Sequence, residues 1–345
     1  MRRLLGIRLI WPIVILVGLL VLNVIIEPSF FTVRVQDGHL FGSLIDILRN
    51  GSPTLLVALG MTLVIATRGI DLSVGAIVAI AGAVACSILA ASPNPGSVST
   101  VIGAVAAAIG VALVLGAWNG ILVAVVGVQP IVATLILMTA GRGVAMLITQ
   151  GQIITVSSAP YKVIGAGYWI GLPASILIAA VMFALAAVFT RKTALGMLIE
   201  SVGVNPEASR LAGVPVRAIV WSAYLFSALC AGVAGIMISS NVTAADSNNA
   251  GLWIELDAIL AVVIGGTSFT GGRYSLAGTL VGAFIIQTLT TTAYTIGVTP
   301  GVMLVFKAIV VATVCLLQSP AFRATALRLL RSLRRKPVAE GGVAS

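Results

Sequence analysis

The sequence predicts an all-α protein that crosses a membrane about ten times. Of its 345 residues, 59% are hydrophobic and only 9% are charged, whereas about 25% of the residues in soluble domains are charged. So few charges cannot cover the apolar surface of a water-soluble globule. The apolar residues also fall into long runs, and about 20 consecutive apolar residues span a bilayer. Positive charges gather in one set of the loops between the runs.

The first predicted element is the run 10–26, which follows Arg2, Arg3 and Arg8. Such a start is typical of a signal peptide, but the run ends at Glu27-Pro28 without a small-x-small cleavage site. We therefore expect an uncleaved first span. Nine further apolar segments follow, and we expect each to be helical: about 53–67, 73–91, 98–126, 130–149, 172–190, 218–240, 256–266, 275–296 and 301–318.

Segment length leaves the number of crossings open. Segments 53–67 and 256–266 are short for a full crossing, and 98–126 is long enough to tilt strongly. Eight spans with two re-entrant segments are therefore an alternative that keeps the same loops inside. Ten crossings that start in the cytoplasm would return the C-terminus to the cytoplasm.

The distribution of positive charge predicts this orientation. Most of the 20 Lys and Arg residues fall in predicted internal segments, and only Arg34, Arg49 and Lys162 fall in external ones. Lys and Arg accumulate in cytoplasmic loops. We expect one membrane domain over 1–320, whose largest internal loop is 191–217, and a basic cytoplasmic tail over 321–345.

Several classes of function are excluded by absent motifs. The sequence has neither a G-x-x-x-x-G-K-[ST] motif nor a Gly-Lys pair, so it has no P-loop for ATP. Its single histidine, His39, argues against His-based metal sites and Ser-His-Asp catalysis. The three cysteines are far apart and have neither zinc spacing nor a disulfide framework. We expect no metal and no cofactor. The net charge of +10 would suggest nucleic acid in a soluble protein, but here it marks internal loops.

Polar residues interrupt or border the spans. Gly69 permits a backbone break between two apolar segments, and Asp71 can cap the following helix. The break is either an interhelical turn or an irregular element that lines a transport pathway. Arg142 within its span should face protein or water, or snorkel to an interface. The candidate pathway residues are Asp71, Ser73, Trp118, Asn119, Arg142, Glu255 and Asp257.

A glycine-rich stretch, 265–273, precedes the Gly278-x-x-x-Gly282 pattern. No strand precedes it and no lysine follows it, so close helix packing or a flexible gate explains it better than a phosphate loop. The sequence 63–66 loosely resembles 262–265, and each is followed by a polar, glycine-containing break. Interrupted helices in corresponding halves indicate a transport site, although chance explains so short a match equally well.

The internal loop 191–217 contains a short predicted helix. Asn205 can be its N-cap, Pro206 suits the first helical position, Glu207 complements the dipole and Gly213 can end it. About two turns are too short to be stable alone in water. The helix must therefore rest on neighbouring loops or on a cytosolic partner, and a transporter without its own ATP site would need such a docking surface.

The order and spacing of these motifs resemble the permease subunit of bacterial ABC sugar importers of the ribose/galactose-type branch. The resemblance is carried by Gly69 to Gly75, Trp118-Asn119-Gly120, Gly203 to Val214, and Glu255 to Gly266. The external stretches 36–43 and 248–253 are similar to galactofuranose importer permeases. Arg68 departs from the pattern, because relatives often carry Gly there. It could pair with Asp71 or alter gating.

The resemblance implies a non-catalytic subunit of an ATP-driven importer in the bacterial inner membrane. Such a subunit moves a monosaccharide, here galactofuranose or a related sugar, from periplasm to cytoplasm. The implied partners are cytosolic ATP-binding subunits, a periplasmic sugar-binding protein, the bilayer, and a second permease subunit that is either a copy or a paralogue. The ATP-binding subunits would dock on Asn205, Pro206, Glu207, Ala208, Arg210 and Gly213.

Two other functions remain to be weighed. A secondary sugar transporter driven by an ion gradient would use Asp71 or Asp257 as its titrating carboxylate, but few acids lie within the spans. An intramembrane enzyme would need clustered acids or a nucleophile near one membrane face. The sequence scarcely supplies them.

Overall fold

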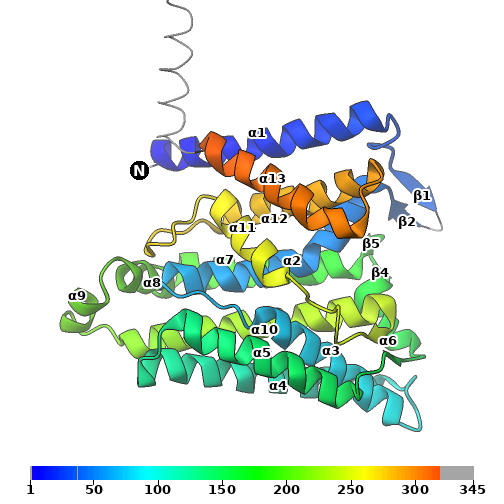
Figure 1. The fold of residues 1–345 in the computed structure, drawn as a ribbon, viewed down its shortest axis with the longest axis horizontal. Coiled ribbons are helices and arrows are strands. Elements are labelled where there is room, and N and C mark those ends of the chain that lie inside the picture. Colours follow the sequence, from blue (N-terminus) through cyan, green and yellow to red (C-terminus); the bar gives the residue numbers. More distant parts are fainter. Residues whose placement is uncertain (1, 37, 319–345) are drawn as a thin grey trace, which may run out of the picture. The chain divides into compact units, whose positions relative to one another are not determined.

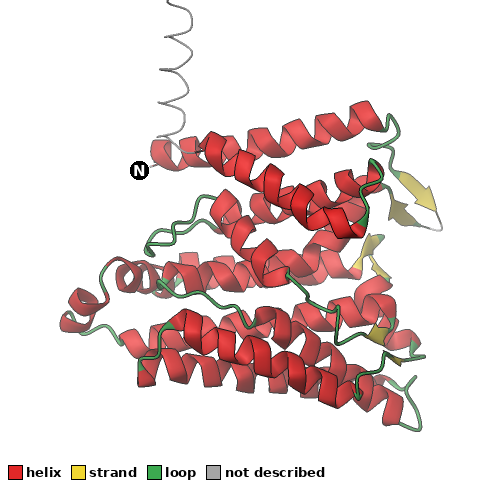
Figure 2. Ribbon diagram, viewed as in Figure 1, coloured by secondary structure: helices red, strands yellow, loops and turns green. Residues whose placement is uncertain are grey.

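The computed structural model describes residues 2–36 and 38–318, so the tail predicted over 321–345 lies outside the described residues. Most of the described chain is helical, and short strands pair at one end of the helices (Figure 2). The described residues up to 292 form one compact unit, and those from 293 to 318 belong to a second. The described part of the second unit holds the last turn of one helix, a turn at Gly297 and one further helix.

The helices follow the chain in the order shown in Figure 1. They are α1 (Arg2–Ile26), α2 (Ser43–Ala66), α3 (Val74–Ala91), α4 (Val98–Ile121) with a π-helical turn (Leu122–Val126), α5 (Pro130–Thr149), α6 (Ala159–Ala166), α7 (Ala174–Lys192), α8 (Leu195–Val204), α9 (Pro206–Leu211), α10 (Val216–Val242), α11 (Ile254–Ile264), α12 (Leu276–Thr295) and α13 (Pro300–Gln318).

Three antiparallel strand pairs lie at the end of the first unit opposite α9 (Figure 1). We call these ends the strand end and the α9 end. The pairs are β1 (Arg34–Gln36) with β2 (His39–Phe41), β3 (Ile154–Thr155) with β6 (Ala244–Ala245), and β4 (Tyr168–Trp169) with β5 (Leu172–Pro173).

The core of the first unit is built by α2, α3 and α10, which are more buried than the other spans before residue 276. Small residues allow these helices to approach closely. A side chain at Gly60 would lie 2.7 Å from the Cα of Ser227, and one at Gly235 would overlap the backbone of Val78. Packing between α11 and α12 is equally close, because Gly278 faces Gly265 and Gly282 faces Ala261. The helix-packing interpretation of this glycine pattern is therefore confirmed.

The outer faces of the helices carry large apolar side chains. Val14 on α1, Val114 on α4 and Leu147 on α5 are among many exposed aliphatic residues. A soluble protein would not present such surfaces to water, whereas lipid tails cover them at no cost. Eight described helices are long and apolar enough to span a membrane: α1, α2, α3, α4 with its π-helical turn, α5, α7, α10 and α12.

Each of the ten predicted apolar segments coincides with a helix, so the all-α membrane class is confirmed. The number of crossings and the cytoplasmic location of both termini stay predictions. Two helix starts were wrong: α1 begins at Arg2, ahead of the run predicted from residue 10, and α2 begins at Ser43, ahead of the segment predicted from residue 53. Residues 43–52 of α2 are amphipathic, with Ile47 buried and Asp46 exposed, so they form a helix without a continuous apolar run.

Helix α11 is too short to cross a bilayer by itself, and an irregular segment spans the remaining distance. Its 11 residues span only about 16 Å, against about 30 Å for a bilayer core. The preceding strand β6 pairs at the strand end, whereas Gly272 beyond α11 donates its backbone N–H to Ala66 O near the α9 end (2.8 Å). The segment 246–273 therefore runs between the two ends as a loop followed by a short helix.

Candidate functional site

Four polar side chains form a buried polar junction at the break between α2 and α3: Asp71, Ser73, Asn119 and Ser227. The Oδ1 atom of Asp71 accepts hydrogen bonds from the backbone N–H of Ser73 (3.1 Å) and from its hydroxyl (2.6 Å). Its Oδ2 atom accepts one from the Ser227 hydroxyl on α10 (2.8 Å). The carboxylate therefore links the break to α10.

Asn119 extends this junction to α4. Its side-chain amide donates to the Ser73 hydroxyl (2.8 Å), and all four junction residues are at most 1% exposed. Hydrogen bonds between membrane helices contribute about 0.6 kcal/mol each on average, so the bonds from Asn119 and Ser227 favour one relative position of α3, α4 and α10. The structure thus brings together three predicted pathway residues, Asp71, Ser73 and Asn119.

Two further buried polar atoms lie in the same region. The Oδ1 atom of Asn119 and the phenolic oxygen of Tyr224 have no hydrogen-bond partner among the described residues. A side chain at Gly69 would lie 2.5 Å from that phenolic oxygen, which places Tyr224 beside the break. Buried polar atoms are nearly always paired in proteins. These two atoms have spare capacity to bind water or a polar solute.

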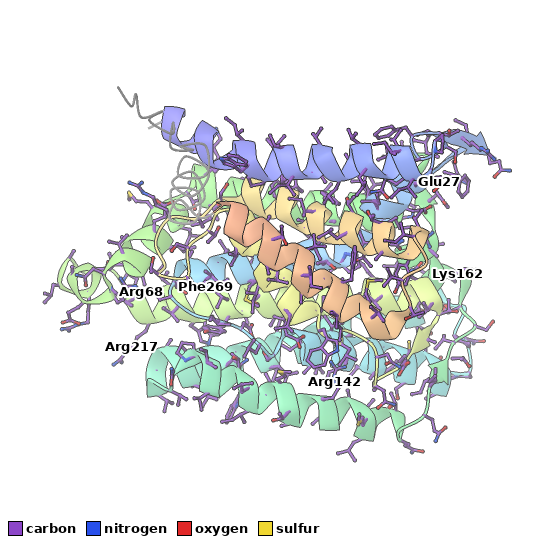
Figure 3. The ribbon with its side chains drawn as sticks, turned by 45° about the horizontal axis from the view of Figure 1, so that its top comes forward. Glu27, Arg68, Arg142, Lys162, Arg217 and Phe269 are labelled. Carbon is purple, nitrogen blue, oxygen red and sulfur yellow. The ribbon has the colours of Figure 1, made fainter. Side chains whose placement is uncertain are left out.

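Arg142 lies on α5 between the strand end and the α9 end (Figure 3). Its guanidinium donates to the carbonyl oxygens of Ser247 (3.2 Å) and Ala250 (2.6 Å) in the irregular segment before α11. The Ser247 hydroxyl donates back to Ala145 O on α5 (3.0 Å). The expectation that Arg142 faces protein is confirmed, and snorkelling is not its role. Irregular backbone at membrane depth requires such partners.

Glu255 is a second buried carboxylate, in the first turn of α11. It is 2% exposed, and its Oε2 atom has no hydrogen-bond partner among the described residues. A side chain at Gly75 would overlap this carboxylate, so α3 and α11 meet there. Asp257 is half-buried. Trp118 is 54% exposed on the outer face of α4, so it is not part of the buried junction that contains its neighbour Asn119.

The short helix predicted in the loop 191–217 is present as α9. The Oδ1 atom of Asn205 accepts from the backbone N–H of Ala208 (3.0 Å), and Pro206 occupies the first helical position. Glu207 and Arg210 form an exposed ion pair (2.5 Å). The hydrogen bond from Arg210 lowers the pKa of the Glu207 carboxyl. Gly213 follows with φ +85°, as expected for the end of a helix.

Helix α8, which the sequence did not predict, leads into α9. Met197 and Val204 on α8 and Leu211 on α9 are 70%, 62% and 76% exposed. The α9 end therefore combines exposed apolar side chains with an exposed ion pair. Figure 3 places Arg68 and Arg217 at this end and Lys162 at the other, in agreement with the predicted separation of internal and external charges.

Arg68 does not pair with Asp71, so that alternative was wrong. Its Nε atom donates to Gly203 O (2.6 Å), and its Nη2 atom donates to Val204 O. Arg68 is exposed, whereas Asp71 is buried and already accepts three hydrogen bonds. The sequence placed Arg68 near Asp71 along the chain, but their side chains belong to different surroundings.

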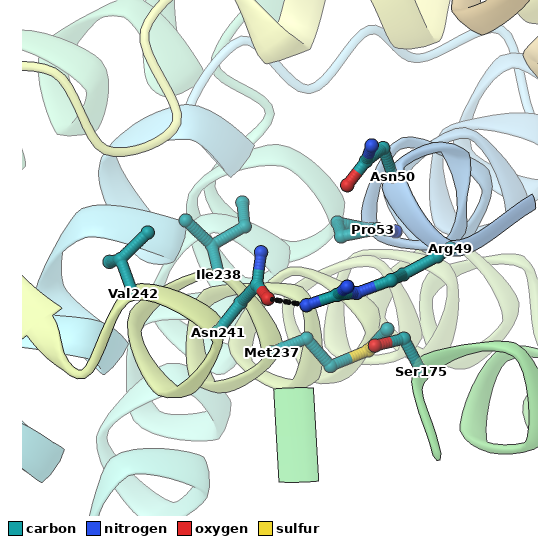
Figure 4. A pocket seen from close by; sticks show the side chains of 8 residues that line it. All are labelled: Arg49, Asn50, Pro53, Ser175, Met237, Ile238, Asn241 and Val242. Atoms are coloured by element: carbon teal, nitrogen blue, oxygen red, sulfur yellow. Dashed lines mark hydrogen bonds between the residues drawn. The ribbon is translucent and has the colours of Figure 1, made fainter. Parts of the chain in front are cut away.

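Sequence reasoning missed a small cavity at the strand end, lined by equal numbers of polar and apolar residues. About 140 Å³ in volume, it lies between α2, α7 and α10, with Arg49 hydrogen-bonded to Asn241 across it (Figure 4). Small-molecule pockets usually measure about 300–1,000 Å³, so this cavity alone is too small for a sugar site. Arg49 was expected in an external loop. Its position beside α10 could have been predicted only from the early start of α2 at Ser43.

The comparisons with known proteins agree with this architecture. Residues 43–315 match the family described as branched-chain amino acid transport system / permease component. The chain is 48% identical to the galactofuranose transporter permease protein YtfT of Escherichia coli (strain K12), over 95% of each chain. It is 40% identical to the fructose import permease protein FruF of Bifidobacterium longum (92% and 90% covered) and 38% identical to the ribose import permease protein RbsC of Escherichia coli (86% and 90%).

No solved structure matches the chain. The relatives overturn the alternative of an ion-driven secondary transporter, since they are permeases of ATP-driven importers. They also agree with the absence of a P-loop in this sequence, because a separate ATPase hydrolyses ATP. ATP-binding subunits and a substrate-binding protein are the partners of such a permease. The chain therefore belongs to the family of ABC importer permeases, inner-membrane proteins with multiple spans, and within it groups with the sugar import permeases.

Proposed function

We propose that this chain imports galactofuranose or a closely related monosaccharide. The observation that carries this proposal is the 48% identity, over 95% of both chains, to a galactofuranose transporter permease, compared with 40% and 38% to the fructose and ribose permeases. The external stretches 36–43 and 248–253, which resemble galactofuranose permeases in sequence, add support.

A second permease subunit, either a copy or a paralogue, would complete the passage. The argument rests on burial: Asp71, Ser73 and Asn119 are closed off from solvent in one chain. A passage must be lined by groups that water can reach, so these residues would contact sugar only when helices separate. Glu255 and Asp257 at α11, Arg142 behind the segment 246–253, and Trp118 on the outer face of α4 are the remaining pathway candidates.

The ATP-binding subunits would dock on the internal loop 191–217 through α9. The docking residues would be Asn205, Pro206, Glu207, Ala208, Arg210 and Gly213. Support comes from exposure: α9 carries an exposed ion pair and a Leu211 that is 76% exposed, at the end of the molecule where the predicted internal charges gather. In this proposal residues 1–320 are the permease domain and 321–345 its cytoplasmic tail.

Reconstitution tests the proposal directly. The permease, its ATPase and its binding protein are placed in proteoliposomes, and uptake of labelled galactofuranose, ribose and fructose is compared with and without ATP. We expect ATP-dependent uptake that favours galactofuranose. Uptake at full rate without ATP would contradict the transport mechanism, and equal uptake of ribose would contradict only the sugar assignment.

Docking is tested with a matched pair of charge reversals. Glu207→Arg changes α9, and Glu27→Arg makes the same change at the opposite end of the molecule (Figure 3). We expect Glu207→Arg to abolish co-purification of the ATPase while the permease stays in the membrane. Glu27→Arg should leave co-purification intact. Equal retention of the ATPase by both variants would refute docking at α9.

A further inference from the structure

Three segments from distant parts of the sequence meet at the α9 end beside Arg68. They are the end of α2 (66–68), the end of α8 (203–204) and the glycine loop (271–272). The Arg68 guanidinium donates to Gly203 O (2.6 Å) and Val204 O, and Gly272 N donates to Ala66 O (2.8 Å). Carbonyls at a helix C-terminus lack partners within the helix. Arg68 donates hydrogen bonds to the last two carbonyl oxygens of α8.

The packing around these bonds leaves little freedom. A side chain at Gly203 would overlap Ala66 O and would lie 2.8 Å from the Cα of Gly272. One at Gly271 would overlap the Arg68 side chain. Closely packed interiors transmit displacement rather than absorbing it. The end of α8 cannot move far without moving the end of α2.

The backbone of Arg68 is unusual as well. Its φ is +66°, a left-handed conformation that is uncommon for a residue with a side chain. Such a conformation persists only where the surroundings hold it. Here two hydrogen bonds to α8 hold the side chain, so the backbone shape at the end of α2 depends on the position of α8.

Arg68 lies between two sites already described. On one side, Val204 is followed directly by Asn205, the N-cap of α9. On the other, Asp71 lies three residues further along the chain and holds α10 through Ser227 and α4 through Ser73 and Asn119. A movement of α8 and α9 would therefore reach the break through Arg68, in addition to the direct chain connection from α9 to α10.

We propose that Arg68 is a positioning residue that transmits movement of α8 and α9 to the buried polar junction between α3, α4 and α10. This inference rests on the proposed docking of an ATPase at α9. In this proposal, Arg68 links the movement caused by ATP hydrolysis to rearrangement of the helices, and it contacts neither the sugar nor ATP.

The test compares Arg68→Gly, Arg68→Lys and Arg273→Ala in the complete importer. Glycine removes the side chain but favours the left-handed backbone, so this variant should fold. Lysine keeps the charge but loses the fork of the guanidinium. Arg273 is an exposed arginine next to the glycine loop and is the matched control.

The primary measurement is sugar transported per ATP hydrolysed. We expect Arg68→Gly to keep the ATPase bound and active but to lower this ratio about tenfold, within the range of about 5- to 150-fold for coupling between sites. Arg68→Lys should fall in between, and Arg273→Ala should match the unaltered importer. An unchanged ratio in Arg68→Gly would overturn the proposal.

A second measurement does not depend on sugar uptake. Leu72, which is half-buried in the break, is replaced by cysteine, and the new thiol is labelled with a maleimide. Cys315 is replaced by serine so that it does not react. The other two cysteines, Cys86 and Cys230, are buried and stay in place. Addition of ATP should change the labelling rate in the unaltered importer but not in Arg68→Gly. An ATP-dependent change of equal size in both would refute transmission through Arg68. Loss of ATPase binding would appear separately, as failed co-purification, and would instead count against docking at α9.

Discussion

The buried polar junction and helix α9 use similar residues in opposite surroundings. In each, a carboxylate lies next to the start of a helix: Asp71 precedes α3, and Glu207 lies in the first turn of α9. Asp71 is 1% exposed and accepts hydrogen bonds from two residues on different elements. The Glu207 side chain is 67% exposed and, among the described residues, bonds to Arg210 within its own helix turn.

This difference shows what each carboxylate contributes. A buried acceptor cannot be removed without leaving its donors unpaired, so the junction stabilises the fold. An exposed ion pair within one helix turn contributes little to stability, because water and salt screen it. Its two charged side chains remain accessible to a partner. The following changes test the contrast by separating effects on unfolding from effects on transport.

The largest effect on stability is expected for Asp71→Ala. Removing the carboxylate leaves the Ser73 and Ser227 hydroxyls without their acceptor, which should lower the free energy of unfolding by about 2–4 kcal/mol. Thermal unfolding in detergent measures this change. Asp71→Asn keeps the shape and one acceptor, so it is the control and should cost less. Equal stability of Asp71→Ala and the unaltered protein would mean that the junction does not hold the helices.

Asn119→Ala should have a smaller effect at the same site. It removes one hydrogen bond, to Ser73, together with an oxygen that has no partner in the described part of the chain, and should cost about 1 kcal/mol. The same melting experiment reports it. Because Asn119 and Asp71 share Ser73, the double variant should cost less than the sum of the two single changes. Strict additivity would indicate two independent contacts.

At α9, removal of the N-cap should act only locally. Asn205→Ala deletes the acceptor for Ala208 N, which costs a helix about 1 kcal/mol. The exposed helix should fray while the core melts at its usual temperature. Amide hydrogen exchange of residues 206–211 should rise, and exchange in α10 should not. Faster exchange in both segments would show that α9 supports the core.

The smallest effect on stability concerns the Glu207–Arg210 pair. Arg210 lowers the pKa of Glu207, so the pair contributes above the ordinary glutamate pKa and is lost as the pH falls through the lowered value. Across the neutral range Glu207 stays charged. The contribution of this pair to the melting temperature, and ATPase co-purification through Glu207, should therefore be independent of pH there. A change in co-purification within that range would mean that another group controls docking.

The sequence by itself predicted the class of the protein, the position of nearly every apolar helix and the cap of α9. These depend on composition and on local chemistry: apolar run length, and the Asn205-Pro206 start with Gly213 at the end. Proximity along the chain was a poor guide to side-chain pairing, as Arg68 and Asp71 show. Whether 205–213 receives an ATPase stays a prediction.

Only the tertiary structure decided which polar residues meet. Asp71, Ser73, Asn119 and Ser227 lie on three separate segments, and Arg142 reaches carbonyls 105 and 108 residues further along the chain. No local pattern encodes these pairings, because they depend on how closely α3, α4, α5 and α10 pack. The amphipathic start of α2 escaped detection for a related reason: its buried face is defined by its neighbours. Local chemistry forms the helices, and burial of polar groups between them selects their arrangement.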